Sequence, residues 1–357
     1  MRERYTTLTD FLIGSQNLPG VDADLIGLLN HVQNACKSIG KAVSRGRLET
    51  LSGVTTAVNV QGEDQKPLDV LSNSILLRAC EWDGQLCGMV SEEIDEPYVV
   101  PDPYPRGRYL LAFDPLDGSS NIDINMTVGT IFSVLRAPDG CDIPTVEDFL
   151  QPGTRQVAAG YAVYGPASML VLTLGDGVHG FTLDRDVGIY VLTHQSMRVP
   201  DTTSEFAVNA SNQRFWEPPV SRYVEECIQG KSGPRGTDFN MRWIASMVAD
   251  LHRILLRGGL YMYPRDSKDP KKAGRLRLLY EASPAAMLME QAGGAASTGR
   301  ERILDIVPTA LHQRIGLVMG SRREVDRLVD YHAAFDRGEP AQFEAPLFNT
   351  RSLFLTA

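Results

Sequence analysis

Three acidic segments each end an apolar, strand-like run, and they hold the residues best suited to chemistry in this 357-residue sequence. The acids are Glu92 and Glu93, Asp114 and Asp117, and Glu281. Strand ends bring side chains together at a crevice, where several carboxylates repel one another unless cations neutralise them. Hard divalent ions with oxygen ligands, above all Mg²⁺, are the natural partners of such a cluster.

The string DPLDGSSN (114–121) adds a second chemical feature to the second segment. Asp114 and Asp117 stand three residues apart across a proline turn and can ligate the same ions from one loop. The backbone N–H groups of Gly118, Ser119 and Ser120 would form a nest for a phosphate if a helix or turn begins there. An isolated pair of acids at this spacing is more often a solvated turn. Together with Gly-Ser-Ser and the preceding strand, however, the pair indicates phosphoryl chemistry.

The elements that must position these residues are helices and short strands. Amphipathic periodicity predicts helices over residues 22–45 (capped by Asp22), 67–80, 218–228, 239–256, 281–292 and 322–335. Apolar runs between Gly, Pro and Asp turns predict a β meander at 87–90, 109–113, 129–136, 157–164, 168–174, 179–183, 188–193 and 205–208, and further strands at 259–263 and 314–319. We therefore expect an α+β fold with helices layered on extensive sheets.

The apolar pattern is interrupted near residues 195–204. This predicts an N-terminal domain over residues 1–196 that carries the DPLDGSS loop, and a C-terminal substrate-binding domain over 197–336. Residues 337–357 would form a tail that is either irregular or packed as an arm on a neighbour.

The charge balance and the cysteines exclude several classes of protein. The chain has 35 Lys and Arg against 44 Asp and Glu, a net charge of −9, which argues against a nucleic-acid or membrane-surface binder. No apolar run has the length of a signal-peptide core or a membrane span. The five cysteines form no CxxC pair and no histidine lies near them at ligand spacing, so we expect mostly buried thiols in a cytoplasmic protein.

The string FDPLDGSSNID (113–123) resembles the signature of the lithium-sensitive, Mg²⁺-dependent sugar-phosphatase superfamily. More narrowly, nearly the whole chain resembles class I fructose-1,6-bisphosphatase, through LDVLSN (68–73), VSEE (90–93), AAGYAVYG (158–165), SMVADLHR (246–253), YP (263–264) and RLRLLYEASP (275–284). The resemblance implies a layered α/β/α/β/α fold with mixed and antiparallel sheets. It also implies hydrolysis of the 1-phosphate of fructose 1,6-bisphosphate by metal-activated water, in gluconeogenesis or the Calvin cycle.

The resemblance further implies a role for each matching residue. The ligands of two or three Mg²⁺ ions (with Mn²⁺ as a substitute) would be Glu92, Asp114, the carbonyl of Leu116, Asp117 and Glu281. The residues that handle the proton of the attacking water would be Glu93 and Asp69, with Glu63 where the family usually has an Asp that reaches a further metal. The residues around the 1-phosphate would be Asp117, Gly118, Ser119, Ser120 and Arg277.

The 6-phosphate would serve as the remote handle that positions the reacting end. The resemblance assigns to this handle Asn209, Tyr263, Arg275 and Arg242, the last reaching across from a neighbouring subunit. A homo-oligomer, either a dimer or a homotetramer, is therefore expected. Asn212 and Trp243 replace tyrosines usual in the animal enzymes, and Arg275 replaces a lysine, which leaves a sedoheptulose-1,7-bisphosphatase or a dual-specificity enzyme as alternatives.

Two kinds of regulation are not expected. The stretch GVDADL (20–25) stands where the family's AMP site has a GTGELT-like stretch, and its two acids would repel a phosphate although Arg108, Tyr109 and Arg136 match other AMP contacts. Weak or absent AMP inhibition follows. Cys141 stands alone between Arg136 and Pro152, which argues against thioredoxin-type switching.

A catalytically silent sensor of sugar phosphates is the non-enzyme alternative. It would show a lost ligand, and no acid of the constellation is missing. An inositol monophosphatase is the weaker alternative among enzymes, since that branch has no arginine like Arg242.

Overall fold

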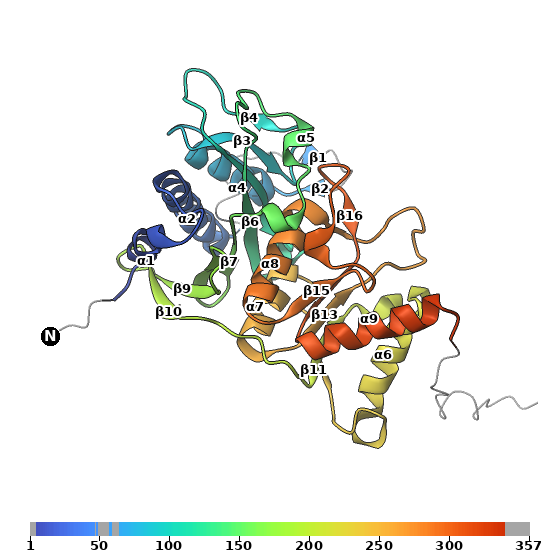
Figure 1. Ribbon diagram of the computed structural model, residues 1–357. Coiled ribbons are helices and arrows are strands. Elements are labelled where there is room, and N and C mark those ends of the chain that lie inside the picture. Colours follow the sequence, from blue (N-terminus) through green and yellow to red (C-terminus); the bar gives the residue numbers. More distant parts are fainter. Residues whose placement is uncertain (1–4, 47, 49–56, 59–63, 340–357) are drawn as a thin grey trace, which may run out of the picture.

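Two large β-sheets alternate with layers of helices in the computed structural model, which describes residues 5–46, 48, 57–58 and 64–339 (Figure 1). The helices are α1 (Leu8–Gly14), α2 (Ala23–Arg45), α4 (Pro67–Cys80), α5 (Val146–Phe149), α6 (Pro218–Gln229), α7 (Met247–Arg257), α8 (Ser283–Gln291) and α9 (Arg322–Asp336). Two further turns matter for the site, the 3₁₀ helix η2 (Ser119–Ile124) and the π-helical turn η6 (Leu278–Ala282).

The larger sheet has the strand order β10-β9-β8-β7-β6-β5-β3-β4. Its strands are β3 (Leu86–Ser91), β4 (Tyr98–Val99), β5 (Tyr109–Asp117), β6 (Val128–Arg136), β7 (Ala158–Tyr164), β8 (Ser168–Thr173), β9 (His179–Asp184) and β10 (Ile189–His194). Neighbours are antiparallel except β3 and β5, which run parallel. Alternate residues of β6 point to opposite faces: Phe132 joins the core beneath α2 and α4, whereas Ile131 joins the core beneath α7 and α8.

The smaller sheet has the order β12-β11-β13-β17-β15. Its strands are β11 (Glu205–Val208), β12 (Asn240–Met241), β13 (Leu260–Tyr263), β15 (Ala295–Ser297) and β17 (Leu317–Gly320). The helices α7 and α8 lie between the two sheets, and α6 and α9 cover the outer face. The chain is therefore layered α/β/α/β/α, and the predicted α+β fold is confirmed. The remaining strands form two small ladders, β1 (Ala57–Val58) with β2 (Asp64–Gln65) and β14 (Leu276–Arg277) with β16 (Arg314–Ile315).

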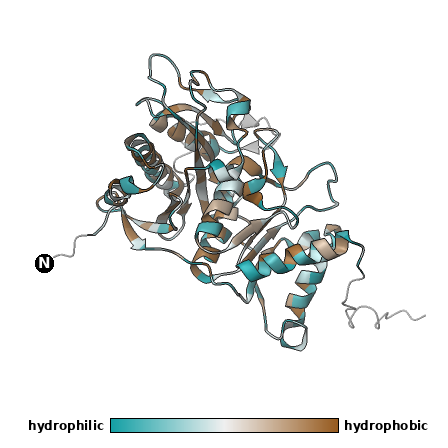
Figure 2. Cartoon of the chain, in the orientation of Figure 1, coloured by the Kyte–Doolittle hydropathy of each residue, from teal (hydrophilic) through white to brown (hydrophobic). Residues whose placement is uncertain are grey.

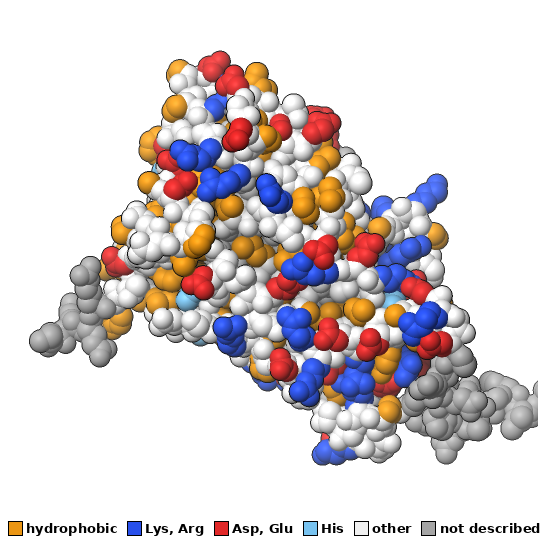
Figure 3. All heavy atoms as spheres, in the orientation of Figure 1, with side chains coloured by type: hydrophobic (Ala, Val, Ile, Leu, Met, Phe, Trp, Pro, Cys, Tyr) orange, Lys and Arg blue, Asp and Glu red, His pale blue; other side chains and the backbone are white. Residues whose placement is uncertain are grey.

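The hydrophobic pattern explains this layering. The strands of the sheets are largely hydrophobic, whereas α6 and α9 alternate hydrophilic and hydrophobic residues (Figure 2). On the face drawn in Figure 3, basic and acidic side chains are interspersed. Among the described residues, no helix combines the length and hydrophobicity that a membrane span requires.

Most predicted elements are present, and four differ. The run 205–208 belongs to the smaller sheet and not to the meander. Only the second half of 239–256 is helical, because Ala245 adopts a positive φ of 63° and ends the irregular stretch before α7. The expected helix at 281–292 begins as the π-helical turn η6, and the run 314–319 is split into β16 and β17 around Gly316. Most of the predicted tail, from residue 340 onward, lies outside the described residues.

Candidate active site

The three acidic segments meet at one edge of the larger sheet. Ser91 at the end of β3 pairs in parallel register with Phe113 of β5, so Glu92 and Asp114 follow side by side. The turn η6 packs against β5 and β6 and brings Glu281 to the same place. Carboxylate oxygens of Asp114, Asp117 and Glu281 lie within 4.8 Å of one another. The structure therefore brings these predicted ligands together.

A local irregularity in β5 turns both of its aspartates into this cluster. The pairing of β5 with β6 shifts register between Asp114 and Asp117. Asp114 Oδ1 accepts a hydrogen bond of 2.9 Å from the backbone N–H of Leu116. Asp117 Oδ2 accepts bonds of 2.8 Å from Ser246 Oγ and from the backbone N–H of Val248, at the start of α7. Each carboxylate is thus oriented by one oxygen, and the irregular strand holds Leu116 between them.

Arg277 connects the cluster to its surroundings. Its Nη2 lies 2.7 Å from Glu92 Oε1, and its Nη1 lies 3.9 Å from Glu281 Oε2. Glu281 Oε2 also accepts a hydrogen bond of 2.5 Å from the backbone N–H of Arg277. The π-helical turn η6 thus brings the side chain of Glu281 back to the backbone of Arg277, the residue that precedes the turn.

The carboxylates of the cluster are unusually reluctant to ionise. Burial, followed by the charges of Glu92, Asp117 and Glu281, raises the pKa of Asp114 well above its ordinary value. Burial also raises the pKa of Glu281 to about 8, with the neighbouring carboxylates adding to the effect and Arg277 opposing it. Burial raises the pKa of Asp117 as well. Such buried, mutually repelling oxygen donors fit a hard divalent cation, because its charge would let them ionise.

Asp69 and Glu93 lie beside the cluster. Asp69 on α4 is buried; its Oδ2 accepts a hydrogen bond of 2.9 Å from the backbone N–H of Lys66, whereas its Oδ1 has no partner among the described residues. Burial, together with the charges of Glu93 and Glu92, raises the pKa of Asp69 to about 7. A group with such a pKa exchanges protons near neutrality. Glu63 lies outside the described residues.

The Gly-Ser-Ser segment turns directly from β5 into η2. Gly118 has a φ of +77°, and a Cβ at this position would lie 2.7 Å from Ser246 Cβ. Glycine is therefore required both by the backbone conformation and by the close approach of α7. The carbonyl of Ser119 accepts a hydrogen bond of 2.9 Å from Lys66 Nζ. The expected turn is present where a phosphate nest was predicted.

A cavity of about 360 Å³ opens beside Asp117. The predicted residues that line it are Asp117, Ser120, Asn209, Tyr263, Arg275 and Arg277. Gly118 and Ser119 adjoin this wall in sequence. Arg242 does not line the cavity within this chain: it is half-exposed, and its Nε lies 3.4 Å from Glu205 Oε1.

Sequence reasoning missed several residues that line the same cavity. They are Tyr261, Ala245, Ser246, Met247, Leu276 and Arg314, and Trp243 was noted only as a departure. The Trp243 ring stacks against both Tyr261 and Tyr263, with centroids 5.8 Å apart in each pair. Arg314 Nη1 donates a hydrogen bond of 2.9 Å to the carbonyl of Arg275. The alternation of Tyr261 and Tyr263 along β13 was the one available signal, since it places both rings on one face.

The region that resembles an AMP site is occupied by internal contacts. Asp22 caps α2 and accepts a hydrogen bond of 2.8 Å from the Tyr109 hydroxyl. Arg108 lies 3.1 Å from Asp24 and 3.6 Å from Asp22, and Arg136 lies 3.8 Å from Asp22. Both arginines that would face a phosphate therefore face carboxylates.

The cysteines differ from expectation in one respect. Four of the five are buried, as predicted, and Cys141 is partly buried. Cys141 is the one cysteine between Arg136 and Pro152, as stated, but the fold brings its Sγ to 3.2 Å from Sγ of Cys87, a contact that was not expected. The two residues are 54 positions apart, so sequence spacing gave no sign of the contact.

Comparisons with known proteins identify the family to which this chain belongs. The family description "Fructose-1-6-bisphosphatase, N-terminal domain" matches residues 6–195, and "Fructose-1-6-bisphosphatase, C-terminal domain" matches residues 199–333. The chain therefore belongs to the fructose-1,6-bisphosphatase family, as its sequence predicted.

Individual relatives show which class of the family this chain is most similar to among the proteins compared. The chain is 60% identical over 348 residues to "Fructose-1,6-bisphosphatase class 1" of Methylacidiphilum infernorum, covering 98% of each chain. It is 59% identical over 350 residues to the protein of the same name from Hydrogenophilus thermoluteolus, covering 98% of this chain and 97% of the relative. Its fold is similar to that of the holo form of Leishmania major fructose-1,6-bisphosphatase, with a TM-score of 0.84 and 40% identity over 92% of this chain and 99% of the other. The predicted resemblance to class 1 enzymes is confirmed.

Proposed function

We propose that this chain hydrolyses the 1-phosphate of fructose 1,6-bisphosphate, giving fructose 6-phosphate and inorganic phosphate. The observation that carries the proposal is the buried carboxylate cluster beside a cavity lined by Arg275 and Arg277. The oxygen of a water molecule forms a bond to phosphorus as the bond between phosphorus and the sugar oxygen breaks. The class 1 relatives, which carry the name of this activity, support the same reaction.

The proposed metal is Mg²⁺, with two or three ions per subunit and Mn²⁺ as a substitute. The residues that would hold it are Glu92, Asp114, Asp117, Glu281 and the carbonyl of Leu116. Bound there, it would supply a water of lowered pKa and neutralise charge on the phosphoryl oxygens. The raised pKa values of Asp114 and Glu281 support a cation among these groups.

The remaining residues of the site bind the substrate and handle protons. Backbone N–H groups of Ser119 and Ser120 and the guanidinium of Arg277 hold the 1-phosphate. Asp69, with Glu93 and Glu63, accepts the proton of the attacking water, and its pKa of about 7 suits that task.

The 6-phosphate would lie at the opposite end of the cavity, against Asn209, Tyr263 and Arg275. Arg242, half-exposed and outside this wall, would reach the 6-phosphate of a neighbouring subunit in a dimer or homotetramer. The contacts to the 6-phosphate stay the same during the reaction. They hold the substrate so that its 1-phosphate lies in position for attack.

We also propose where the two domains divide and where in the cell the protein acts. The division into residues 1–196 and 197–336 is supported by the larger sheet, which ends at His194, and by the smaller, which begins at Glu205. A cytoplasmic location suits a phosphorylated sugar substrate.

The deciding experiment measures phosphate release from fructose 1,6-bisphosphate and from sedoheptulose 1,7-bisphosphate, each with and without Mg²⁺. Metal-dependent release from the fructose compound supports the proposal. Preference for the sedoheptulose compound would favour the alternative function, a sedoheptulose-1,7-bisphosphatase. Trp243 and Arg275 suggested that alternative, and both line the cavity beside Asp117. Binding of either compound without any release would identify a silent sensor.

A further inference from the structure

The start of β11 carries a buried carboxylate that the proposed reaction does not use. Glu205 is buried, although a carboxylate is costly to bury unless cationic partners surround it. Its Oε2 accepts a hydrogen bond of 3.0 Å from Arg253 Nη1, and its Oε1 accepts one of 2.8 Å from Arg257 Nη2. The Nε of Arg242 lies 3.4 Å from the same Oε1. One buried acid thus gathers three arginines.

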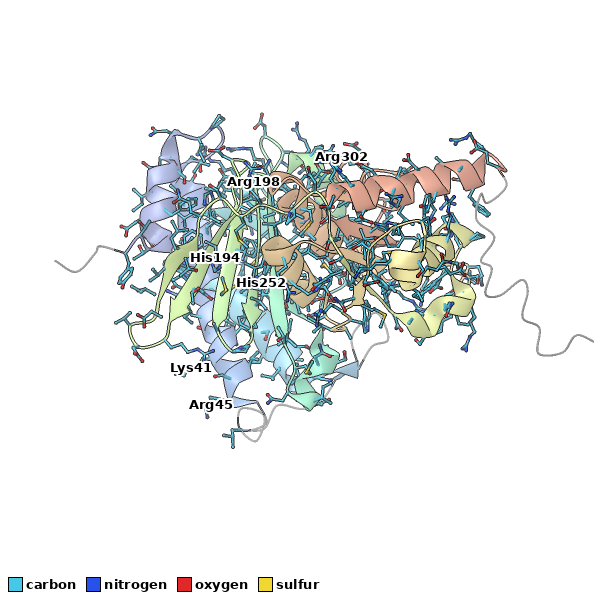
Figure 4. The ribbon with its side chains drawn as sticks, turned by 90° about the horizontal axis from the view of Figure 1, so that it is seen from below. Lys41, Arg45, His194, Arg198, His252 and Arg302 are labelled. Carbon is cyan, nitrogen blue, oxygen red and sulfur yellow. The ribbon has the colours of Figure 1, made fainter. Side chains whose placement is uncertain are left out.

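Two of these arginines lie on α7 and differ in what they require. Arg253 is largely buried, and its Nε and Nη2 donate hydrogen bonds of 3.3 and 3.1 Å to Asp250 Oδ1. In Figure 4, His252, the residue before Arg253, lies between the strands of the larger sheet and the C-terminal elements. The side chain of Arg257 is 60% exposed, so water can solvate it without Glu205. These two arginines explain how Glu205 can be buried, and they hold its carboxylate in one place.

The third arginine, Arg242, is held at both its backbone and its side chain. Its backbone N–H donates a hydrogen bond of 2.7 Å to the carbonyl of Phe206, where β12 runs beside β11. Its side chain is half-exposed, with Nε facing Glu205. Trp243, the next residue, lines the active-site cavity, whereas Arg242 does not. Within the part of the chain that the structure describes, no acceptor takes a hydrogen bond from Nη1 or Nη2 of Arg242, so both groups are available to a ligand.

We propose that Glu205 is a positioning residue, which holds Arg242 by its Nε so that both Nη groups can bind the remote phosphate of a substrate in a neighbouring subunit. An arginine loses rotamer freedom when it binds a phosphate, and an existing contact reduces that loss. Three guanidinium groups against the carboxylates of Glu205 and Asp250 leave the group positive, so the attraction for a phosphate remains. The inference rests on the proposed function, which gives Arg242 its role.

The test is a double-mutant cycle in the full-length protein with Mg²⁺, made of the unchanged chain, Glu205→Gln, Arg242→Ala and the combined variant. Glu205→Gln should raise KM for fructose 1,6-bisphosphate about three- to tenfold and leave kcat nearly unchanged, because the remote contacts are the same before and during the reaction. Inhibition by fructose 6-phosphate, which carries only the remote phosphate, should weaken by the same factor. In the Arg242→Ala background, replacing Glu205 should have no further effect on KM.

Two further variants separate positioning from stability. Arg257→Gln is the matched control, because it removes another partner of Glu205 Oε1 without touching Arg242, and it should leave KM unchanged. Glu205→Asp keeps a buried charge beside Arg253 but shortens the reach towards Arg242. It should also raise KM, and the cycle is run with this variant if Glu205→Gln does not fold.

The inference is wrong if Arg242→Ala raises KM and neither substitution of Glu205 does, a result that leaves the proposed function standing. It is also wrong if the effects of the two substitutions on KM multiply in the combined variant, or if loss of Glu205 changes KM only by dissociating the oligomer, as measured by sedimentation. Glu205 would then be a structural partner of Arg253. A normal KM for Arg242→Ala would overturn both this inference and the proposed role of Arg242.

Discussion

Replacing Glu281 with Gln should separate stability from catalysis in this protein. Burial, with the charges of Glu92 and Asp117, raises the pKa of Glu281 from 4.5 to about 8. The folded, metal-free protein therefore binds one more proton than the unfolded chain between these two pH values. Stability must fall as pH rises through this window, by about 1.4 kcal/mol per unit, and it levels off above pH 8. At pH 7 the cost is about 3 kcal/mol.

Gln removes this cost because it cannot ionise, and its carbonyl still accepts the backbone N–H of Arg277. The metal-free Glu281→Gln variant should therefore melt at a higher temperature than the unchanged protein at pH 8, and at the same temperature near pH 4. Thermal melts from pH 4 to pH 9 in a chelator measure this difference. The rise in melting temperature on adding Mg²⁺ should be smaller in the variant, because one ligand has lost its charge.

The same substitution should lower kcat by about two to three orders of magnitude at saturating Mg²⁺. A suitable control is Glu290→Gln. Glu290 lies on α8, outside the site, and its partly buried carboxylate pairs with Arg302. This control should leave phosphate release unchanged. Near-normal turnover of the Glu281 variant, or a lower melting temperature at pH 8 without metal, would refute the reasoning.

Three further outcomes are expected. Gly118→Ala should lower both kcat and melting temperature, because the left-handed conformation costs an alanine about 1–2 kcal/mol and its Cβ would meet Ser246 at 2.7 Å. Gly140 has the same φ of +77°, but a Cβ added there would meet nothing within 4 Å, so Gly140→Ala is the matched control. The difference between the two variants in melting temperature and turnover measures the contact with Ser246. Equal effects of the two substitutions would contradict this explanation. Trp243→Ala should raise KM for the bisphosphate more than it lowers kcat, and Trp243→Phe should recover most of the loss; an unchanged KM would exclude Trp243 from substrate binding. Micromolar AMP should not inhibit phosphate release, because the arginines of that region face Asp22 and Asp24, and strong inhibition would overturn this explanation.

The layers of the fold were predictable because hydrophobic periodicity depends on which faces are buried. The helix predicted over 22–45 appears as α2, with Asp22 accepting the backbone N–H of Leu25 at 2.9 Å. The helix predicted over 239–256 was wrong in its first half. There, Asn240 and Met241 pair with β11, a contact between residues far apart in sequence. Local periodicity cannot report such a pairing.

The site was predictable where acids follow strands, and not where its walls come from scattered segments. Glu92 and Asp114 meet because β3 and β5 are parallel neighbours, so ends of two apolar runs were a sufficient signal. Trp243 and Arg314 line the cavity from a loop and a two-residue strand, neither of which carries a motif. The contact of Cys87 with Cys141 was missed for the same reason, since it depends on how a loop folds back onto β3.

Arg277 is the residue through which metal and substrate binding should influence each other. Its guanidinium pairs with Glu92 at 2.7 Å and also lines the cavity beside Asp117, so one charge would serve both the carboxylate cluster and a bound phosphate. A divalent cation held by the cluster competes with Arg277 for those carboxylates and makes their ionised forms more favourable. The guanidinium of Arg277 is then freer to bind a phosphate. Conversely, a phosphate that draws Arg277 away from the carboxylates would strengthen their binding of the cation. By linkage the two effects are equal, so cation and bisphosphate should each tighten the binding of the other. In a chain with a net charge of −9, this coupling would let an anionic substrate bind beside buried acids.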